Sequence, residues 1–243
     1  MRLRTTAAAG LFSLALLAGG CGRLPVYPMG QYVPPDQVTD FHTLYNTNCR
    51  ACHGANGENG PAIDLANPEY QALVDDATLR GIVANGMPGT QMPAWAQSAG
   101  GMLTDAQVDA IVAGMRKEWL KPNAFDGATP PPYALPPAAG AKAAKNEAGD
   151  AKHGQQLYQA HCESCHTGPK RQELTSPVYL ALISDQALRS IVIAGRPDIG
   201  QPDWRHDNGQ LSAQDVTDIV AYLGSLRTSA TISAPLIPLS SRR

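Results

Sequence analysis

The chain has 243 residues, of which 43% are hydrophobic and 16% are charged, and its formal net charge is −2 at pH 7. This length allows two small domains, and the near-neutral charge excludes the broad basic surface that nucleic-acid binding requires. Beyond the N-terminus, no segment approaches the roughly eighteen uninterrupted apolar residues of a transmembrane helix.

The N-terminus has the pattern of an export signal. Arg2 and Arg4 precede an apolar stretch, 11–18, which is too short to span a bilayer and is typical of a secretory signal peptide. The following Leu17-Ala18-Gly19-Gly20-Cys21 resembles the lipobox of bacterial lipoproteins. This resemblance implies that residues 1–20 are removed and that Cys21 is acylated, so that the protein is anchored to a membrane on the periplasmic side without spanning it. A free thiol is the alternative for Cys21.

An extended segment, 21–37, is expected to lead into a helical domain at 38–120. Its predicted elements are a short helix at 38–46, the motif Cys49-Arg50-Ala51-Cys52-His53, a helix at 77–85 and a loop rich in glycine and proline. Thr104 and Gln107 form a capping-box pattern that starts a last, amphipathic helix. Its apolar residues recur at helical spacing: Val108, Ile111, Val112, Met115 and Trp119.

Proline-rich residues 121–152, ending in alanine, lysine and glycine, predict an inter-domain linker. A second helical domain follows at 153–227, with helices predicted at 154–160, at 186–194 and after Ser212. It contains a second copy of the motif, Cys162-Glu163-Ser164-Cys165-His166. The last residues, 228–243, are predicted to be a tail.

The pattern C-x-x-C-H predicts covalent attachment of haem. The two cysteines can form thioethers with the haem vinyl groups, and the histidine can bind the iron. A redox disulfide or a structural zinc site also uses paired cysteines, but neither explains a histidine directly after both pairs. We therefore expect two covalently attached haem c groups. Their predicted thioether residues are Cys49, Cys52, Cys162 and Cys165, and the predicted iron ligands are His53 and His166.

The two domains are copies of one another. Residues 67–95 align without gaps to 176–204 at an offset of 109, and 13 of the 29 pairs are identical. The identical pairs include Asp76 with Asp185 and Trp95 with Trp204. Such similarity indicates an internal duplication. Each copy has only about eighty residues, so a largely apolar haem would complete its interior.

Both domains resemble class I cytochrome c domains, arranged in tandem as in dihaem cytochromes c. The resemblance implies a mainly α fold in which the first helix of each domain packs against the last. Gly154 and Tyr158 match the family's pattern of a glycine and then an aromatic residue in the first helix. Phe41 stands where the first domain would have that glycine.

The resemblance also suggests iron ligands. The sixth ligand in this family is usually a methionine followed by proline in the loop before the last helix, which matches Met92, with Met87 as the rival. The other nitrogen of His53 should donate to a backbone carbonyl, for which Pro61 is the matching residue. In the second domain, Gln201 occupies the position of Met92.

Several ligands therefore remain open for the second iron. They are Gln201 or a water, His206, or a methionine from elsewhere such as Met102 or Met29. An amide oxygen or a second histidine would give a lower potential than histidine with methionine.

Four further residues recur in both domains and carry indole or guanidinium donors. These donors suit haem propionates, although the same residues can equally serve the fold alone. The four residues are Trp95, Trp204, Arg80 and Arg189.

The sequence thus predicts a membrane-anchored dihaem cytochrome c that carries single electrons, and it favours this role over an enzymatic one. By resemblance, its partners would be respiratory complexes such as a quinol-oxidising cytochrome bc type complex and a haem-copper terminal oxidase. One alternative is a dihaem oxidoreductase or ligand-binding subunit with an open second haem. Another is a structural subunit whose contact arms are residues 23–38 and 228–243.

Overall fold

The computed structural model describes residues 32–136, 149–167, 173–205 and 211–227. Within these ranges the protein is helical and forms two isolated bridges but no strands, which confirms the mainly α prediction. The compact body begins at Val38, and a short 3₁₀ helix, η1 (Pro35–Gln37), precedes it in the chain. The predicted signal peptide, Cys21, Met29, His206 and the tail lie outside the described residues.

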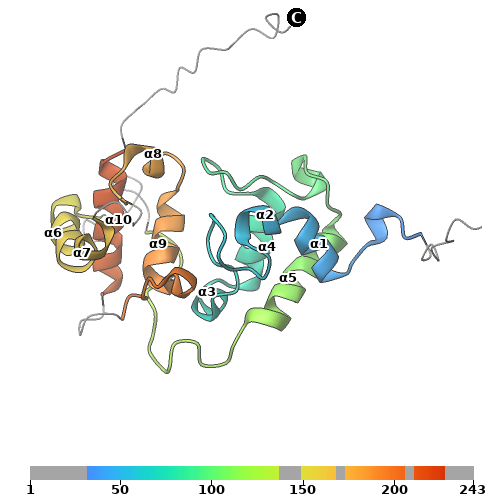
Figure 1. Cartoon of the computed structure of the whole chain (residues 1–243), viewed down its shortest axis with the longest axis horizontal. Coiled ribbons are helices and arrows are strands. Elements are labelled where there is room, and N and C mark those ends of the chain that lie inside the picture. The colour runs from blue at the N-terminus through green and yellow to red at the C-terminus, as the bar shows by residue number, and fades with distance from the viewer. Residues whose placement is uncertain (1–31, 137–148, 168–172, 206–210, 228–243) are drawn as a thin grey trace, which may run out of the picture. The chain divides into compact units, whose positions relative to one another are not determined.

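The first domain is built from five α-helices and one 3₁₀ helix, drawn in blue to green in Figure 1. They are α1 (Phe41–Asn48), α2 (Arg50–His53), α3 (Pro68–Leu73), α4 (Asp76–Asn85), η2 (Gln97–Ala99) and α5 (Asp105–Trp119).

The second domain repeats this order, in yellow to red (Figure 1). Its elements are α6 (Ala151–His161), α7 (Glu163–His166), α8 (Pro177–Leu180), α9 (Asp185–Ala194), η3 (Pro197–Ile199) and α10 (Ala213–Ser225).

Side-chain caps set where the helices begin. The predicted capping box at Thr104 is confirmed, and Ser212 forms another with Asp215. The predicted starts of two helices were wrong, because α1 begins only after Asp40 and α6 begins already after Asp150, each of which accepts backbone N–H groups of its own first turn. The predicted linker therefore includes the first residues of α6.

Two short helices, α3 and α8, were not predicted. Each begins with a proline, Pro68 or Pro177, in its first turn. A proline is tolerated there because an N–H in the first turn has no partner within the helix. Six or fewer residues are too few to show helical periodicity in the sequence.

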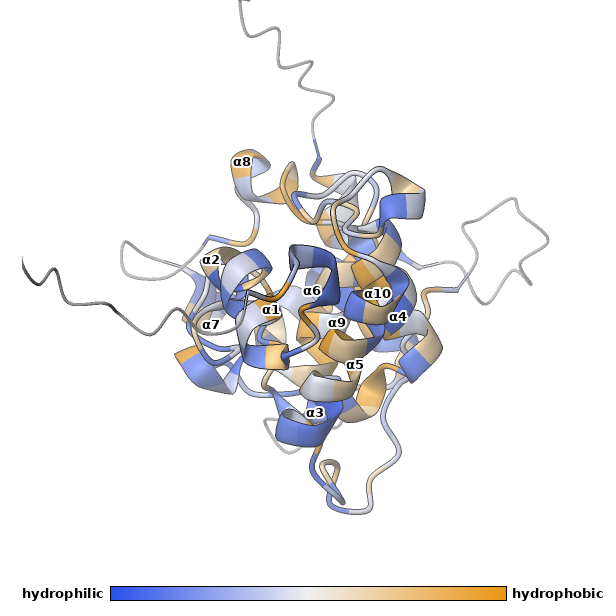
Figure 2. Cartoon of the chain, turned by 90° about the vertical axis from the view of Figure 1, so that its right-hand side faces the viewer, coloured by the Kyte–Doolittle hydropathy of each residue, from blue (hydrophilic) through white to orange (hydrophobic). Residues whose placement is uncertain are grey.

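The last helix of each domain provides much of the core. Figure 2 shows hydrophobic residues along α5, α9 and α10 and mostly hydrophilic ones along α3. The buried apolar positions of α5 are Val108, Ile111, Val112 and Met115, and those of α10 are Val216, Ile219, Val220 and Leu223. The predicted amphipathic faces of both helices are confirmed.

The crossing of the first and last helices uses a glycine in both domains, but on opposite partners. In the first domain the ring of Phe41 in α1 lies over Gly114 of α5, where an added Cβ would be 2.1 Å from the ring. In the second domain the glycine is Gly154 of α6, where an added Cβ would be 1.9 Å from the carbonyl oxygen of Asp218 in α10. When the N-caps Thr104 and Ser212 are aligned, Tyr222 stands at the position of Gly114. A glycine therefore permits the close helix contact in both domains, against an aromatic ring in the first and against helix backbone in the second.

The described part of the predicted linker is not a free spacer. The ring of Phe125 packs edge-on against Trp204, with ring centroids 5.3 Å apart. The side chain of Gln186 in α9 donates to the carbonyl of Tyr133 at 2.7 Å and accepts from the N–H of Leu135 at 3.3 Å. Residues 121–136 are therefore held against the second domain through α9 and Trp204.

Candidate haem sites

The first motif forms a single helical turn at the end of α1. The N–H of Cys49 donates to the carbonyl of Tyr45 at 2.8 Å, and α2 follows at once. The hydroxyl of Tyr45 donates to the carbonyl of Gly54 at 2.9 Å and so ties α1 to the residue after the motif. Tyr45 thereby fixes the direction in which α2 presents Cys52 and His53.

His53 is placed as an iron ligand would be. Its side chain is buried, and its Nδ1 lies 2.9 Å from the carbonyl oxygen of Ile63. With Nδ1 donating to that oxygen, Nε2 is the nitrogen that can face iron. Burial lowers the pKa of His53 and keeps the imidazole neutral, the form that binds metal.

The expected carbonyl partner, Pro61, was wrong by two residues. The N–H of Ala62 donates to the carbonyl of Cys52 at 2.9 Å, so the chain returns to the motif only after the proline. Ile63 is the residue that then faces His53. The prediction that a backbone carbonyl orients His53 is confirmed, and the identity of the residue is corrected.

The four cysteines of the two motifs form no disulfide bond. In each motif the first cysteine is half-buried and the second is exposed. Burial raises the pKa of Cys49 and of Cys162 to about 11, so both are uncharged at neutral pH.

The loop after α4 brings the two candidate methionines together. Gly86 has φ +68° and turns the chain out of the helix. The N–H of Met87 donates to the carbonyl of Met92 at 3.1 Å, and Thr90 bonds to the backbone of both. Both methionines are half-buried. The choice of Met92 as the sixth ligand stays a prediction.

In the second domain, His166 is half-buried and lines a cavity of about 830 Å³ together with Tyr158, Pro177 and Tyr222. A volume of this order is typical of sites that hold a ligand or cofactor. Gln201 lies elsewhere, lines a cavity of about 400 Å³, and donates through Nε2 to the carbonyl of Ile191 at 3.4 Å. Its role at the second iron stays a prediction.

The repeated arginines join the fourth helix of each domain to the last one. Arg80 binds Asp109 at 2.6 Å and Asp105 at 3.1 Å on the surface of α5. Arg189 is buried, donates to the hydroxyl of Thr217 at 3.0 Å, and donates to the carbonyl of Pro132 at 2.8 Å. These contacts give both arginines a role in helix packing, and a contact with propionates stays a prediction.

The repeated tryptophans differ in their surroundings. Trp95 is half-buried and packs against the core of the first domain, and its backbone N–H donates to the carbonyls of Val83 and Ala84 in α4. Trp204 is almost completely buried between Phe125 and the guanidinium of Arg205, whose Cζ lies 4.9 Å from the ring centroid. The different environments show that a shared position in the repeat does not mean a shared contact.

The contacts of a second pair of arginines were not predicted from the sequence. Arg116 of α5 pairs with Asp76 at 2.8 Å and donates to the carbonyls of Gln71 and Val74. In the second domain Arg227, which follows α10, pairs with Asp185 and donates to the corresponding carbonyls of Leu180 and Ile183. The identity of Asp76 and Asp185 in the repeat was the available signal. It was obscured because Arg227 comes three positions later than Arg116 when the caps Thr104 and Ser212 are aligned.

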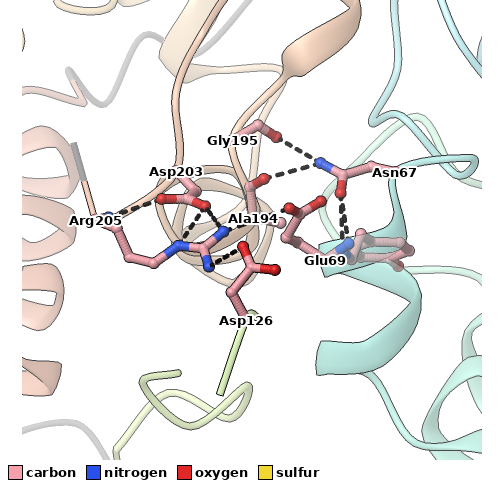
Figure 3. A network of polar contacts seen from close by, with 8 residues as sticks. Asn67, Glu69, Asp126, Ala194, Gly195, Asp203 and Arg205 are labelled. Atoms are coloured by element: carbon pink, nitrogen blue, oxygen red, sulfur yellow. Dashed lines mark hydrogen bonds and ion pairs between the residues drawn. The ribbon is translucent and has the colours of Figure 1, made fainter. Parts of the chain in front are cut away.

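Polar contacts join the two domains. The buried side chain of Asn67 caps α3 through its oxygen, and its nitrogen donates to the carbonyls of Ala194 at 2.9 Å and Gly195 at 3.3 Å. Figure 3 shows this amide bonded to the backbone of Ala194 and Gly195, and it shows the guanidinium of Arg205 between Asp203, Asp126 and Glu69. The contacts of Asn67 and Glu69 with the second domain were not predicted, because they join residues 127 to 136 positions apart.

Comparison with known proteins agrees with this architecture. The family described as cytochrome C oxidase, cbb3-type, subunit III matches residues 36–113 and 149–223. Each match covers one of the two motif-bearing domains.

Relatives of known description are of two kinds. The cytochrome bc1 complex cytochrome c subunit of Corynebacterium diphtheriae is 26% identical over 93% of this chain and 82% of its own length. The protein of the same description from Mycobacterium bovis is 28% identical over 91% of this chain and 77% of its own. The dihydro-heme d1 dehydrogenase of Pseudomonas aeruginosa is 40% identical over 72 residues, which are 29% of this chain and 13% of that protein.

The matched residues include both C-x-x-C-H motifs and the helices that carry them. A chain of this kind holds haem c covalently. The chain therefore belongs to the cytochrome c family described as cytochrome C oxidase, cbb3-type, subunit III, with two such domains in tandem.

Proposed function

We propose that the chain is a dihaem cytochrome c that carries single electrons between respiratory partners on the periplasmic side of a membrane, to which Cys21 anchors it. The proposed partners are a quinol-oxidising complex and a terminal oxidase or a similar acceptor. Two relatives are described as cytochrome c subunits of bc1 complexes, which supports a place in a respiratory chain. Haem c, when bound, supplies a one-electron couple.

The observation that carries this proposal is the environment of His53. A buried, neutral imidazole with its Nδ1 committed to Ile63 is oriented for permanent ligation. Met92 or Met87 in the loop before α5 would complete the ligand set and leave no open position for a substrate. The residues around this motif thus favour electron transfer over catalysis.

The second site supports an alternative function. Gln201 replaces the methionine, and its side-chain nitrogen is directed to α9. A weakly ligated second haem could serve a dihaem oxidoreductase or a ligand-binding subunit. Exposure of the reduced protein to carbon monoxide distinguishes the two functions, because a rapid spectral change would favour the alternative and no change would favour electron transfer.

The haem content is tested by quantifying haem per chain. We expect two in the unaltered protein and one after Cys162→Ala with Cys165→Ala. Electron transfer is tested by mixing the reduced protein with membranes that contain an active terminal oxidase. Oxidation that stops on specific inhibition of the oxidase supports the proposal, and a reduced protein that stays reduced contradicts it.

The anchor is tested separately with Cys21→Ser. We expect the unaltered protein in the membrane fraction and the variant in the soluble periplasmic fraction. Equal distribution of both forms would contradict acylation at Cys21.

A further inference from the structure

The loop of the second domain that corresponds to the methionine loop of the first is closed by a short hairpin. At the offset of the repeat, Arg196 and Gln201 stand where the first domain has Met87 and Met92. Arg196 and Gln201 exchange two backbone hydrogen bonds of 2.9 Å, and Gly195 before them has φ +71°. The two residues that close this loop are thus polar where the first domain has methionines, and in both loops the N–H of the first residue of the pair donates to the carbonyl of the second.

This hairpin holds a segment of the first domain. The guanidinium of Arg196 is buried and donates to the carbonyls of Ala62 at 2.9 Å and Gly60 at 3.1 Å. The side chain of Asp198 accepts two bonds of 2.8 Å from Arg196 and one of 2.9 Å from the N–H of Asn59. The planar guanidinium of Arg196 therefore donates to one carboxylate and to two backbone carbonyls.

The segment held in this way lies behind the first iron ligand. The next residue, Ile63, accepts the hydrogen bond from His53, and Ala62 is bonded to Cys52 within the motif. A shift of residues 59–62 would therefore move the carbonyl that orients the imidazole.

We infer that Arg196 and Asp198 are positioning residues for the first haem, supplied by the second domain through the loop that no longer provides a methionine. This inference rests on the haem site proposed at His53. The arginine cation disfavours the additional positive charge of oxidised iron, and the aspartate offsets this effect. Together the pair fixes the loop that carries Ile63.

Removing the charge of Arg196 and removing that of Asp198 should shift the midpoint potential of the first haem in opposite directions. Arg196→Gln removes the cation and leaves a buried carboxylate, so the midpoint potential of the first haem should fall. Asp198→Asn removes the anion, so that potential should rise. Both potentials are read from a spectroscopic redox titration, with the first haem identified in a variant that carries Cys162→Ala and Cys165→Ala and therefore only that haem.

A matched control removes another guanidinium from the same domain boundary. Arg205 contacts Glu69 of the first domain at 3.5 Å but does not touch residues 59–63. Arg205→Gln should therefore leave the potential of the first haem unchanged. If it shifted that potential as much as Arg196→Gln does, the effect would come from domain docking in general and the inference would be wrong.

Amide hydrogen exchange gives a readout that does not depend on redox chemistry. We expect faster exchange at Ala62 in Arg196→Gln, no change in Arg205→Gln, and an intermediate rate in Arg196→Lys, which keeps the charge but not the planar fork. Unchanged exchange and unchanged potential in Arg196→Gln would overturn the inference. Failure of the electron-transfer proposal would instead appear as missing oxidation by membranes, with these shifts still present.

Discussion

An alanine at position 154 would place its Cβ 1.9 Å from the carbonyl oxygen of Asp218, in the crossing of α6 and α10. That oxygen belongs to the backbone of α10 and can recede only if the two helices move apart. We therefore expect Gly154→Ala to destabilise the second domain. Gly81, in the middle of α4, offers the matched control, because an added Cβ there would meet no atom within 4 Å.

The magnitudes follow from two opposing effects. Overpacking of a core costs about 1–3 kcal/mol, and a clash with backbone belongs at the upper end. Alanine recovers about 0.8–1 kcal/mol, since glycine is a poor helix former. Gly154→Ala should thus lose about 2 kcal/mol of unfolding free energy. Gly81→Ala, which has no clash, should gain up to about 1 kcal/mol.

The assay is guanidinium unfolding of the haem-loaded protein, followed by circular dichroism of the helices. The two variants should move in opposite directions and differ by about 3 kcal/mol. A Gly154→Ala protein as stable as the unaltered one would refute the steric reasoning. A loss of similar size in both variants would refute it as well, because the control has no clash.

Three other outcomes are expected. Gly114→Ala should destabilise the first domain, and it should do so much less when Phe41 is also replaced by alanine. A double-mutant cycle should give a coupling free energy of about 1 kcal/mol or more, and additive losses would contradict the contact. Burial raises the pKa of Asp64 to about 6, because the folded protein disfavours the charged carboxylate. The resulting loss of stability is absent below pH 3.8 and complete above about pH 6. Asp64→Asn should remove up to about 3 kcal/mol of pH dependence from urea unfolding, and an unaltered pH profile would exclude this cause. Gln201→Met should raise the lower midpoint potential by a fraction of the ~0.8 V range that axial ligands span, and an unchanged titration would place Gln201 away from the iron.

Local signals predicted the longer helices well. Thr104 and Ser212 cap helices whose apolar periodicity is long enough to be unambiguous. The starts of α1 and α6 were missed because Asp40 and Asp150 cap them outside the apolar pattern. The short α3 depends on a proline and a buried asparagine, and its periodicity is too brief to detect.

Of the first candidate haem site, only the residues of the C-x-x-C-H motif could be predicted reliably from the sequence. Cys49, Cys52 and His53 follow from spacing, and the need for a carbonyl behind His53 follows from metal chemistry. Which carbonyl faces the imidazole depends on how the loop returns to Cys52, and the alignment pointed to the wrong residue. The contacts of Arg196 join segments about 135 positions apart, and nothing local in the sequence indicates them.

The contact between Phe41 and Gly114 limits which helices can pair while the chain folds. A duplicated chain could pair α1 with α10 and so mix its two halves. Phe41 needs a glycine opposite its ring, and α10 has Tyr222 at the position of Gly114. Pairing of α1 with α10 would put two aromatic rings in the same space, which overpacks the crossing. The first helix is thus directed to the partner from its own half, although the two halves descend from one sequence.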